Sequence, residues 1–113
     1  MQLLEVKTIS ILNKLIYTIV VTYNGMRWID RCLNSLLATT IPTHILVIDN
    51  SSNDGTSEYI KTNFPSVEVI SSNVNLGFGS ANNIGFQKAL DLKADFVFLL
   101  NQDASIEPDI VSS

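Results

Sequence analysis

The sequence lacks most of the residues on which several common kinds of site are built. Its 113 residues include one cysteine and one histidine, so no internal disulfide can form and no cysteine–histidine cluster has zinc-ligand spacing. It also contains no G-x-x-x-x-G-K-[ST] loop, no G-x-G-x-x-G fingerprint and no G-x-S-x-G elbow. P-loop, dinucleotide-fingerprint and serine-hydrolase chemistry are therefore not indicated.

Positive charge is scarce as well. The chain has 7 Lys+Arg against 11 Asp+Glu and a net charge of -4. Because phosphate neutralisation on nucleic acid needs clustered cations, we expect no nucleic-acid partner. A smaller anionic ligand would have to be held by a metal ion or by backbone N–H groups.

Long apolar runs are missing too. Polar residues interrupt the N-terminal stretch 1–15, and no segment reaches the roughly 18 apolar residues of a membrane span. The order of a signal peptide, basic and then apolar, is not present there. We expect residues 1–15 to be an N-terminal extension or lead-in, and the absence of export signals predicts a cytoplasmic protein.

Alternating strand and helix patterns fill the rest of the chain. Its composition, 46% hydrophobic and 16% charged, favours one small domain with strands buried on both faces. Apolar and β-branched runs predict strands at 16–21, 44–49, 67–71 and 95–100, and helical spacing predicts helices over 26–39, 51–64 and 80–93. This order predicts an α/β, Rossmann-like βαβαβαβ fold with a parallel sheet.

Polar side chains follow each predicted strand. They are Thr22, Tyr23 and Asn24 after the first, Asp49 and Asn50 after the second, the loop 73–79 after the third, and Asn101 and Asp103 after the fourth. In an open parallel sheet, ligands bind outside the carboxyl ends of the strands. The sequence therefore predicts that these four clusters meet at one edge and form a binding site.

The residue types in these clusters indicate a nucleotide. Tyr23 offers an aromatic face on which a base can stack, and Asn50 offers a donor and an acceptor to a pyrimidine edge. Gly77 would let the backbone approach a ligand, next to the free N–H groups of the following helix. The alternatives are a simple strand–helix turn around Tyr23 and a loop at 73–79 that binds nothing.

The fourth cluster indicates a metal ion. Asp103 follows a buried strand, two residues after Asn101, where its carboxylate would hold a hard cation, Mg²⁺ or Mn²⁺. Such an ion would neutralise a diphosphate in a site without lysine or arginine. The alternative is that Asp103 caps the turn before Glu107 and Pro108.

Four motifs in this order resemble a known family. They are VVTYNG (20–25), VIDNSSNDGT (47–56), NLGFGSANNIGF (75–86) and LLNQDA (99–104). The chain resembles the N-terminal, nucleotide-binding part of family 2 glycosyltransferases with the GT-A fold, most of all the rhamnosyltransferase-like branch. The resemblance implies metal-assisted, inverting transfer of a sugar, with rhamnose as the candidate, from a dTDP- or UDP-sugar to a glycan or lipid-linked acceptor in cell-surface polysaccharide biosynthesis.

The resemblance also implies roles for single residues. The nucleotide-binding positions that it suggests are Thr22, Tyr23, Asp49, Asn50, Asn75, Gly77, Asn83, Asn101 and Asp103, with Asn24 beside the first pair. Asn101 stands where the family's D-x-D motif has its first aspartate, which leaves Asp103 as the expected metal ligand.

In the family the general base lies well downstream of this motif. We therefore expect residues 16–113 to be the nucleotide-sugar-binding part of a glycosyltransferase domain, ending before the base and the acceptor-binding part. The resemblance further implies peripheral association of the full-length protein with the inner face of the membrane. Two other classes stay open from the residues alone: a receiver-like signalling domain phosphorylated on Asp49, and a non-catalytic α/β interaction domain.

Overall fold

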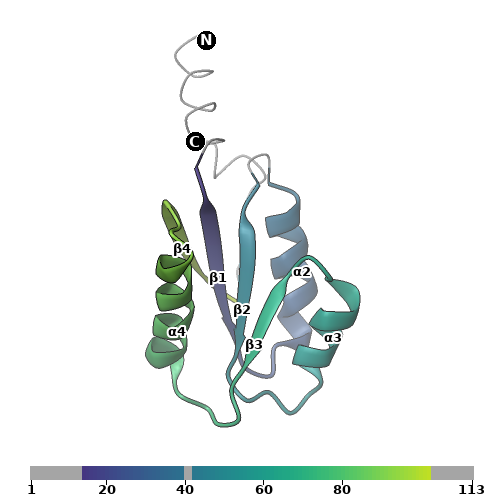
Figure 1. Ribbon diagram of the computed structural model, residues 1–113. Helices are drawn as coiled ribbons and strands as arrows, with labels where there is room; N and C mark the ends of the chain where they lie inside the picture. The colour runs from purple at the N-terminus through teal and green to yellow at the C-terminus, as the bar shows by residue number, and fades with distance from the viewer. Residues whose placement is uncertain (1–13, 40–41, 103–113) are drawn as a thin grey trace.

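The chain folds as a parallel sheet with helices on both faces (Figure 1). The computed structural model describes residues 14–39 and 42–102. Its elements are β1 (Ile16–Thr22), α2 (Met26–Leu37), β2 (His44–Asp49), α3 (Thr56–Asn63), β3 (Glu68–Ser71), α4 (Phe78–Asp91) and β4 (Phe96–Asn101). The predicted α/β fold with βαβαβαβ order is confirmed.

The sheet has the order β3-β2-β1-β4, and all its strand pairs are parallel. The register aligns Thr22 of β1 with Asp49 of β2, and Asp49 in turn with Ser71 of β3. On the other side of β1, Val21 is aligned with Asn101 of β4. All four strands therefore end at nearly the same level, and the polar segments that follow them emerge at one edge.

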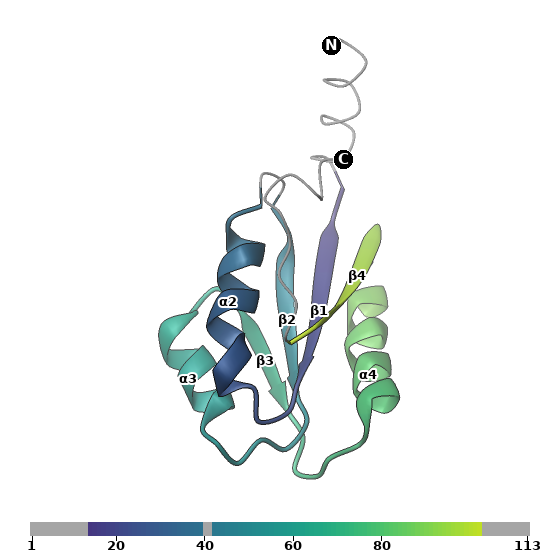
Figure 2. The same cartoon turned by 180° about the vertical axis from the view of Figure 1, so that it is seen from behind.

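Helices α2 and α3 cover one face of the sheet, and α4 covers the other, as Figures 1 and 2 show from opposite sides. On the α2–α3 face, Val20 and Val47 pack with Leu33 in a buried core. On the α4 face, Ile19 and Leu46 belong to a second core. Adjacent residues of β1 thus enter different cores, which explains why this strand is apolar almost without interruption.

Small residues let α4 lie close to the sheet. Ala81, Gly85 and Ala89 recur every four residues on its buried side. A Cβ atom added at Gly85 would lie 2.6 Å from Cγ2 of Ile19. Glycine at this position therefore brings the helix backbone into direct contact with β1.

The structure fixes where two helices begin. The capping residues that open segment 51–64 predict an N-cap near Asp54 or Thr56, and α3 begins at Thr56, after Ser51 and Gly55 with positive φ of 72° and 88°. Helix α4 begins at Phe78, directly after Gly77, whose φ is 84°. A left-handed residue cannot continue a right-handed helix, so each helix starts just past one.

Strand β4 differs from the central strands. Phe96, Phe98 and Leu99 are exposed, because β4 lies at an edge of the described sheet. None of the three helices in the described part of the chain is long and apolar enough to span a bilayer. Of the expected lead-in, residues 1–13 lie outside the described part.

Candidate functional site

A hollow of about 490 Å³ is lined by residues at the ends of the strands. Strands β1, β2 and β3 end at the lower edge of the sheet in Figure 1. Its volume is in the range of small-ligand sites. The lining residues are Val21, Tyr23, Asn50, Asn75, Gly77, Phe78, Asn101 and Gln102. Five of these eight were predicted from the sequence as ligand-binding residues, and they come from all four strand ends.

The turn after β1 is tied to the end of β4 by Gln102. The hydroxyl of Thr22 donates to Gln102 Oε1 at 2.6 Å, and the backbone N–H of Tyr23 donates to the same oxygen at 2.9 Å. In return, Gln102 Nε2 donates to the carbonyl of Tyr23 at 3.3 Å. Tyr23 is 44% exposed and lines the hollow, so an aromatic residue with a fixed backbone borders it.

The loop between β3 and α4 is held by two asparagine side chains. The N–H of Leu76 donates to Asn50 Oδ1 at 2.7 Å, and Asn50 Nδ2 donates to the carbonyl of Gly77 at 3.1 Å. Asn75 Oδ1 accepts the N–H of Gly77 at 2.9 Å. Asn50 is only 3% exposed, so its amide shapes the wall of the hollow and retains one N–H and one lone pair.

Behind this wall lies a second layer of polar residues. The Asp49 carboxylate is 3% exposed and accepts hydrogen bonds from the backbone and the hydroxyl of Ser52. The N–H of Asn24 donates to Ser52 Oγ at 2.8 Å, and Asn24 Oδ1 accepts the N–H of Asn53 at 2.8 Å. These bonds lock the turns after β1 and β2 together. A carboxylate buried and bonded in this way is poorly placed to accept a phosphoryl group, which disfavours a receiver-like domain.

Asp54 joins the starts of two helices. It accepts the backbone N–H of Met26 at the start of α2 and that of Thr56 at the start of α3, satisfying donors that a helix leaves open. Desolvation acts to raise the pKa of Asp54, but hydrogen bonds from the Thr56 side chain and from these N–H groups outweigh it and hold the pKa below its usual value. Asp54 is therefore a structural carboxylate.

The lining of the hollow combines apolar and amide side chains and is uncharged. None of the eight described residues around it carries a formal charge, and within residues 14–39 and 42–102 no group of three or more histidine, cysteine, aspartate or glutamate side chains could hold a metal ion. Asn101 contributes an amide oxygen, a ligand type that hard cations accept. The predicted metal ligand, Asp103, lies outside the described residues.

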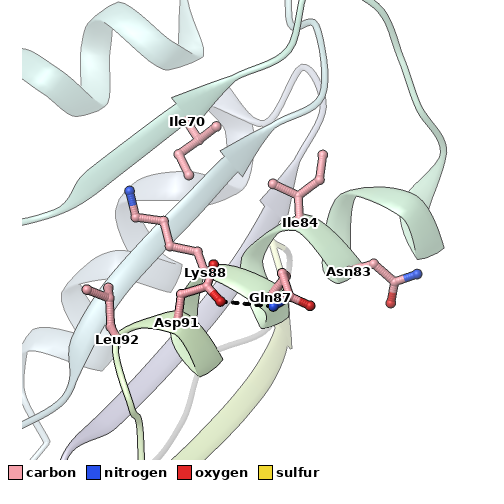
Figure 3. Close-up of a pocket in the computed structure, with 7 residues that line it drawn as sticks. All are labelled: Ile70, Asn83, Ile84, Gln87, Lys88, Asp91 and Leu92. Atoms are coloured by element: carbon pink, nitrogen blue, oxygen red, sulfur yellow. Dashed lines mark hydrogen bonds between the residues drawn. The ribbon is translucent and has the colours of Figure 1, made fainter.

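Some predicted residues do not line the hollow. Thr22, Asn24 and Asp49 are not among the lining residues, and their hydrogen bonds hold the turns beside it. Asn83 lines a different depression between α4 and β3, together with Ile70, Ile84 and Lys88 (Figure 3). Several polar groups of that depression are already paired, Gln87 with Asp91 and Lys88 with Glu68.

Three lining residues were not predicted: Val21, Phe78 and Gln102. Val21 and Phe78 lie inside two of the quoted motifs, VVTYNG and NLGFGSANNIGF, but neither side chain offers a hydrogen-bonding group that would single it out. Gln102 lies between Asn101 and Asp103 inside a third motif, LLNQDA, and its place between two predicted site residues was the signal that pointed to it.

Known proteins are similar to this chain in sequence and in fold. Residues 17–113 match the family model described as Glycosyl transferase family 2. A Mycobacterium tuberculosis N-acetylglucosaminyl-diphospho-decaprenol L-rhamnosyltransferase is 39% identical over 66 residues, which are 58% of this chain and 22% of that protein. A Micrococcus luteus undecaprenyl-phosphate mannosyltransferase is 30% identical over 97 residues, 83% of this chain and 40% of that protein.

Solved structures of glycosyltransferases have a similar fold. Staphylococcus aureus TarS in complex with UDP superposes with a TM-score of 0.74 at 25% identity, over 84% of this chain and 29% of that one. A Pyrobaculum calidifontis mannosyltransferase in complex with GDP-Man and Mn²⁺ has the same fold, with a TM-score of 0.72 at 22% identity over 81% of this chain and 28% of that one. The chain thus spans less than half the length of these relatives. On the match over residues 17–113, it belongs to glycosyl transferase family 2.

Proposed function

We propose that this chain is the donor-binding part of a glycosyltransferase, and that its hollow binds the nucleoside diphosphate of a dTDP- or UDP-sugar. The observation that carries the proposal is the convergence of Tyr23, Asn50 and Asn101 on one uncharged hollow at the strand ends. Rhamnose is the candidate sugar, supported by the relative that is a rhamnosyltransferase.

In this proposal the base lies against the ring of Tyr23, which is exposed while its backbone is held. Asn50 would meet the base or nucleoside with the donor and acceptor that the loop leaves unused, and Asp49 stands directly behind it. Asn75 and Gly77 would border the nucleotide from the loop side. A pyrimidine fits because its edge presents a donor beside acceptors.

A divalent ion, Mg²⁺ or Mn²⁺, would be held by Asp103 and the diphosphate, beside the amide oxygen of Asn101. The uncharged lining supports this, because a diphosphate in such a hollow needs a counter-charge from elsewhere. When bound, the ion would neutralise the charge that develops on the departing diphosphate. The similar mannosyltransferase structure contains Mn²⁺ with its nucleotide sugar.

The transfer itself would invert the anomeric centre, with a general base outside residues 16–113 taking the proton of the acceptor hydroxyl. The acceptor would be a glycan or a lipid-linked intermediate of a cell-surface polysaccharide, at the cytoplasmic face of the membrane. The relatives support this class of acceptor, since two of their names refer to decaprenol- and undecaprenyl-linked molecules.

Calorimetric titration with UDP and with dTDP, in the presence and absence of Mn²⁺, tests this proposal. We expect binding that requires Mn²⁺ and is lost in Asp103→Ala. Asp91→Ala is the matched control, because Asp91 pairs with Gln87 on α4 and lies away from the hollow. No binding of either nucleotide, or equal binding in Asp103→Ala and the wild type, would contradict the proposal.

A further inference from the structure

The side-chain amide of Gln102 makes hydrogen bonds to the backbone of the turn after β1, as the backbone of a neighbouring strand would. Its oxygen accepts the N–H of Tyr23 at 2.9 Å, and its nitrogen donates to the carbonyl of the same residue at 3.3 Å. One amide therefore satisfies both backbone polar groups of Tyr23. The hydroxyl of Thr22, which is fully buried, adds a third bond to the same oxygen at 2.6 Å.

Close packing holds Gln102 in this arrangement. A Cβ atom at Gly25 would lie 2.5 Å from Gln102 Oε1 and 2.2 Å from Thr22 Oγ1, so the amide occupies space that a glycine leaves open. Next to it, the thiol of Cys32 is 3.9 Å from the carbonyl oxygen of Asn101. The end of β4 is thus held against both the turn after β1 and helix α2.

The hydrogen-bonding capacity of Gln102 is largely used within the protein. Both lone pairs of Oε1 accept bonds from the turn, and one of the two N–H groups of Nε2 donates back to it. Gln102 nevertheless lines the hollow together with Tyr23 and Asn101. A side chain in this situation acts on a ligand through the neighbours that it holds.

We propose that Gln102 is a positioning residue, which sets the ring of Tyr23 at the distance from Asn101 that a nucleoside diphosphate requires. This inference rests on the proposed nucleotide-binding function. It predicts that the effect of removing the Gln102 amide on nucleotide affinity passes through Tyr23, rather than through a contact between Gln102 and the ligand.

A double-mutant cycle measures this coupling. Gln102→Met keeps the length of the side chain and removes its hydrogen bonds, and Tyr23→Ala removes the ring. The affinity for UDP and dTDP with Mn²⁺ should fall by about 5- to 150-fold in Tyr23→Ala, the range for loss of one base-stacking aromatic, and by about tenfold in Gln102→Met. The double variant should bind within about twofold of Tyr23→Ala alone. Losses that multiply would overturn the inference, because they would mean that Gln102 acts independently of Tyr23.

Two comparisons separate positioning from a general loss of structure. Gln87→Met makes the same chemical change on α4, where the amide bonds to Asp91 at 3.0 Å, and should leave affinity within twofold of the wild type. If Gln102→Met does not fold, Thr22→Val removes one of the three bonds and should weaken binding, whereas Thr22→Ser keeps the hydroxyl and should restore it.

The outcomes also distinguish the inference from the function on which it rests. If the wild type binds neither nucleotide, the proposed function is overturned, and the inference with it. If the wild type binds and both Gln102→Met and Thr22→Val bind equally well, only the inference is overturned.

Discussion

Replacing Gly25 by alanine tests how tightly the turn after β1 is packed. Gly25 has φ of -96° and ψ of 13°, a conformation that alanine adopts without backbone strain. The added Cβ would lie 2.2 Å from Thr22 Oγ1 and 2.5 Å from Gln102 Oε1, whereas real Cβ atoms essentially never approach another heavy atom within 3.0 Å. The side chains of Thr22 and Gln102 must therefore shift, which breaks the bonds they make to each other and to the turn.

The expected cost follows from what surrounds the new methyl group. Overpacking a tight site costs about 1–3 kcal/mol, and breaking the Thr22–Gln102 hydrogen bond costs about 1 kcal/mol more. Against this, alanine reduces the conformational entropy of the unfolded chain, which stabilises by about 0.4–1 kcal/mol. We expect Gly25→Ala to lower the free energy of unfolding by about 1–3 kcal/mol.

Equilibrium urea denaturation followed by circular dichroism gives this quantity. Gly79→Ala is the matched control, because a Cβ at Gly79, in the first turn of α4, meets nothing within 4 Å. The control should be as stable as the wild type or more stable by up to about 1 kcal/mol. Equal stability of the Gly25→Ala and Gly79→Ala variants would refute the reasoning from close packing.

Three further variants probe other parts of the structure. Gly85→Ala should lower the free energy of unfolding by up to about 2 kcal/mol, because its Cβ would lie 2.6 Å from Ile19 Cγ2, a cost of about 1–3 kcal/mol that the helix propensity of alanine offsets by about 1 kcal/mol. In urea denaturation, adding Ile19→Ala should cost less in this background than in the wild type, and equal costs would exclude the contact as the cause. Asn50→Ala should speed amide hydrogen exchange at Leu76, which loses its acceptor, and an unchanged exchange rate would show that the loop does not depend on this side chain. Asp54→Asn should be less stable than the wild type at neutral pH by about 1 kcal/mol, because hydrogen bonds to a charged acceptor are stronger than those to an amide, less what solvent screens at this exposed site. The folded-state pKa of Asp54 is lowered, so its contribution to stability is complete above the ordinary pKa of aspartate and is lost as pH falls through the folded-state value. Urea denaturation should therefore show the stabilities of the two proteins converging in acid. A difference that stays constant with pH would contradict this assignment.

The local pattern of the sequence was sufficient for the elements and for the sheet edge at which the hollow lies. Apolar runs with β-branched residues predict the limits of β2 correctly and those of β1 to within one residue. The reason is that a strand buried on both faces has to be apolar at each successive position. Strand–helix alternation then requires parallel strands, and parallel strands bring their carboxyl ends to one edge. The convergence of Tyr23, Asn50 and Asn101 follows from these two rules without knowledge of the strand order.

Only the tertiary structure decided which side chains line the hollow and which hold it together. The order β3-β2-β1-β4 places β4 beside β1, and this neighbourhood lets Gln102 reach a turn 79 residues earlier in the chain. In the same way, Asn50 is bonded to the loop that begins α4, and Asn83 lines a different depression on that helix. Such pairings depend on strand register and on the rotation of each helix about its axis, and neither is recorded in the local periodicity of a sequence.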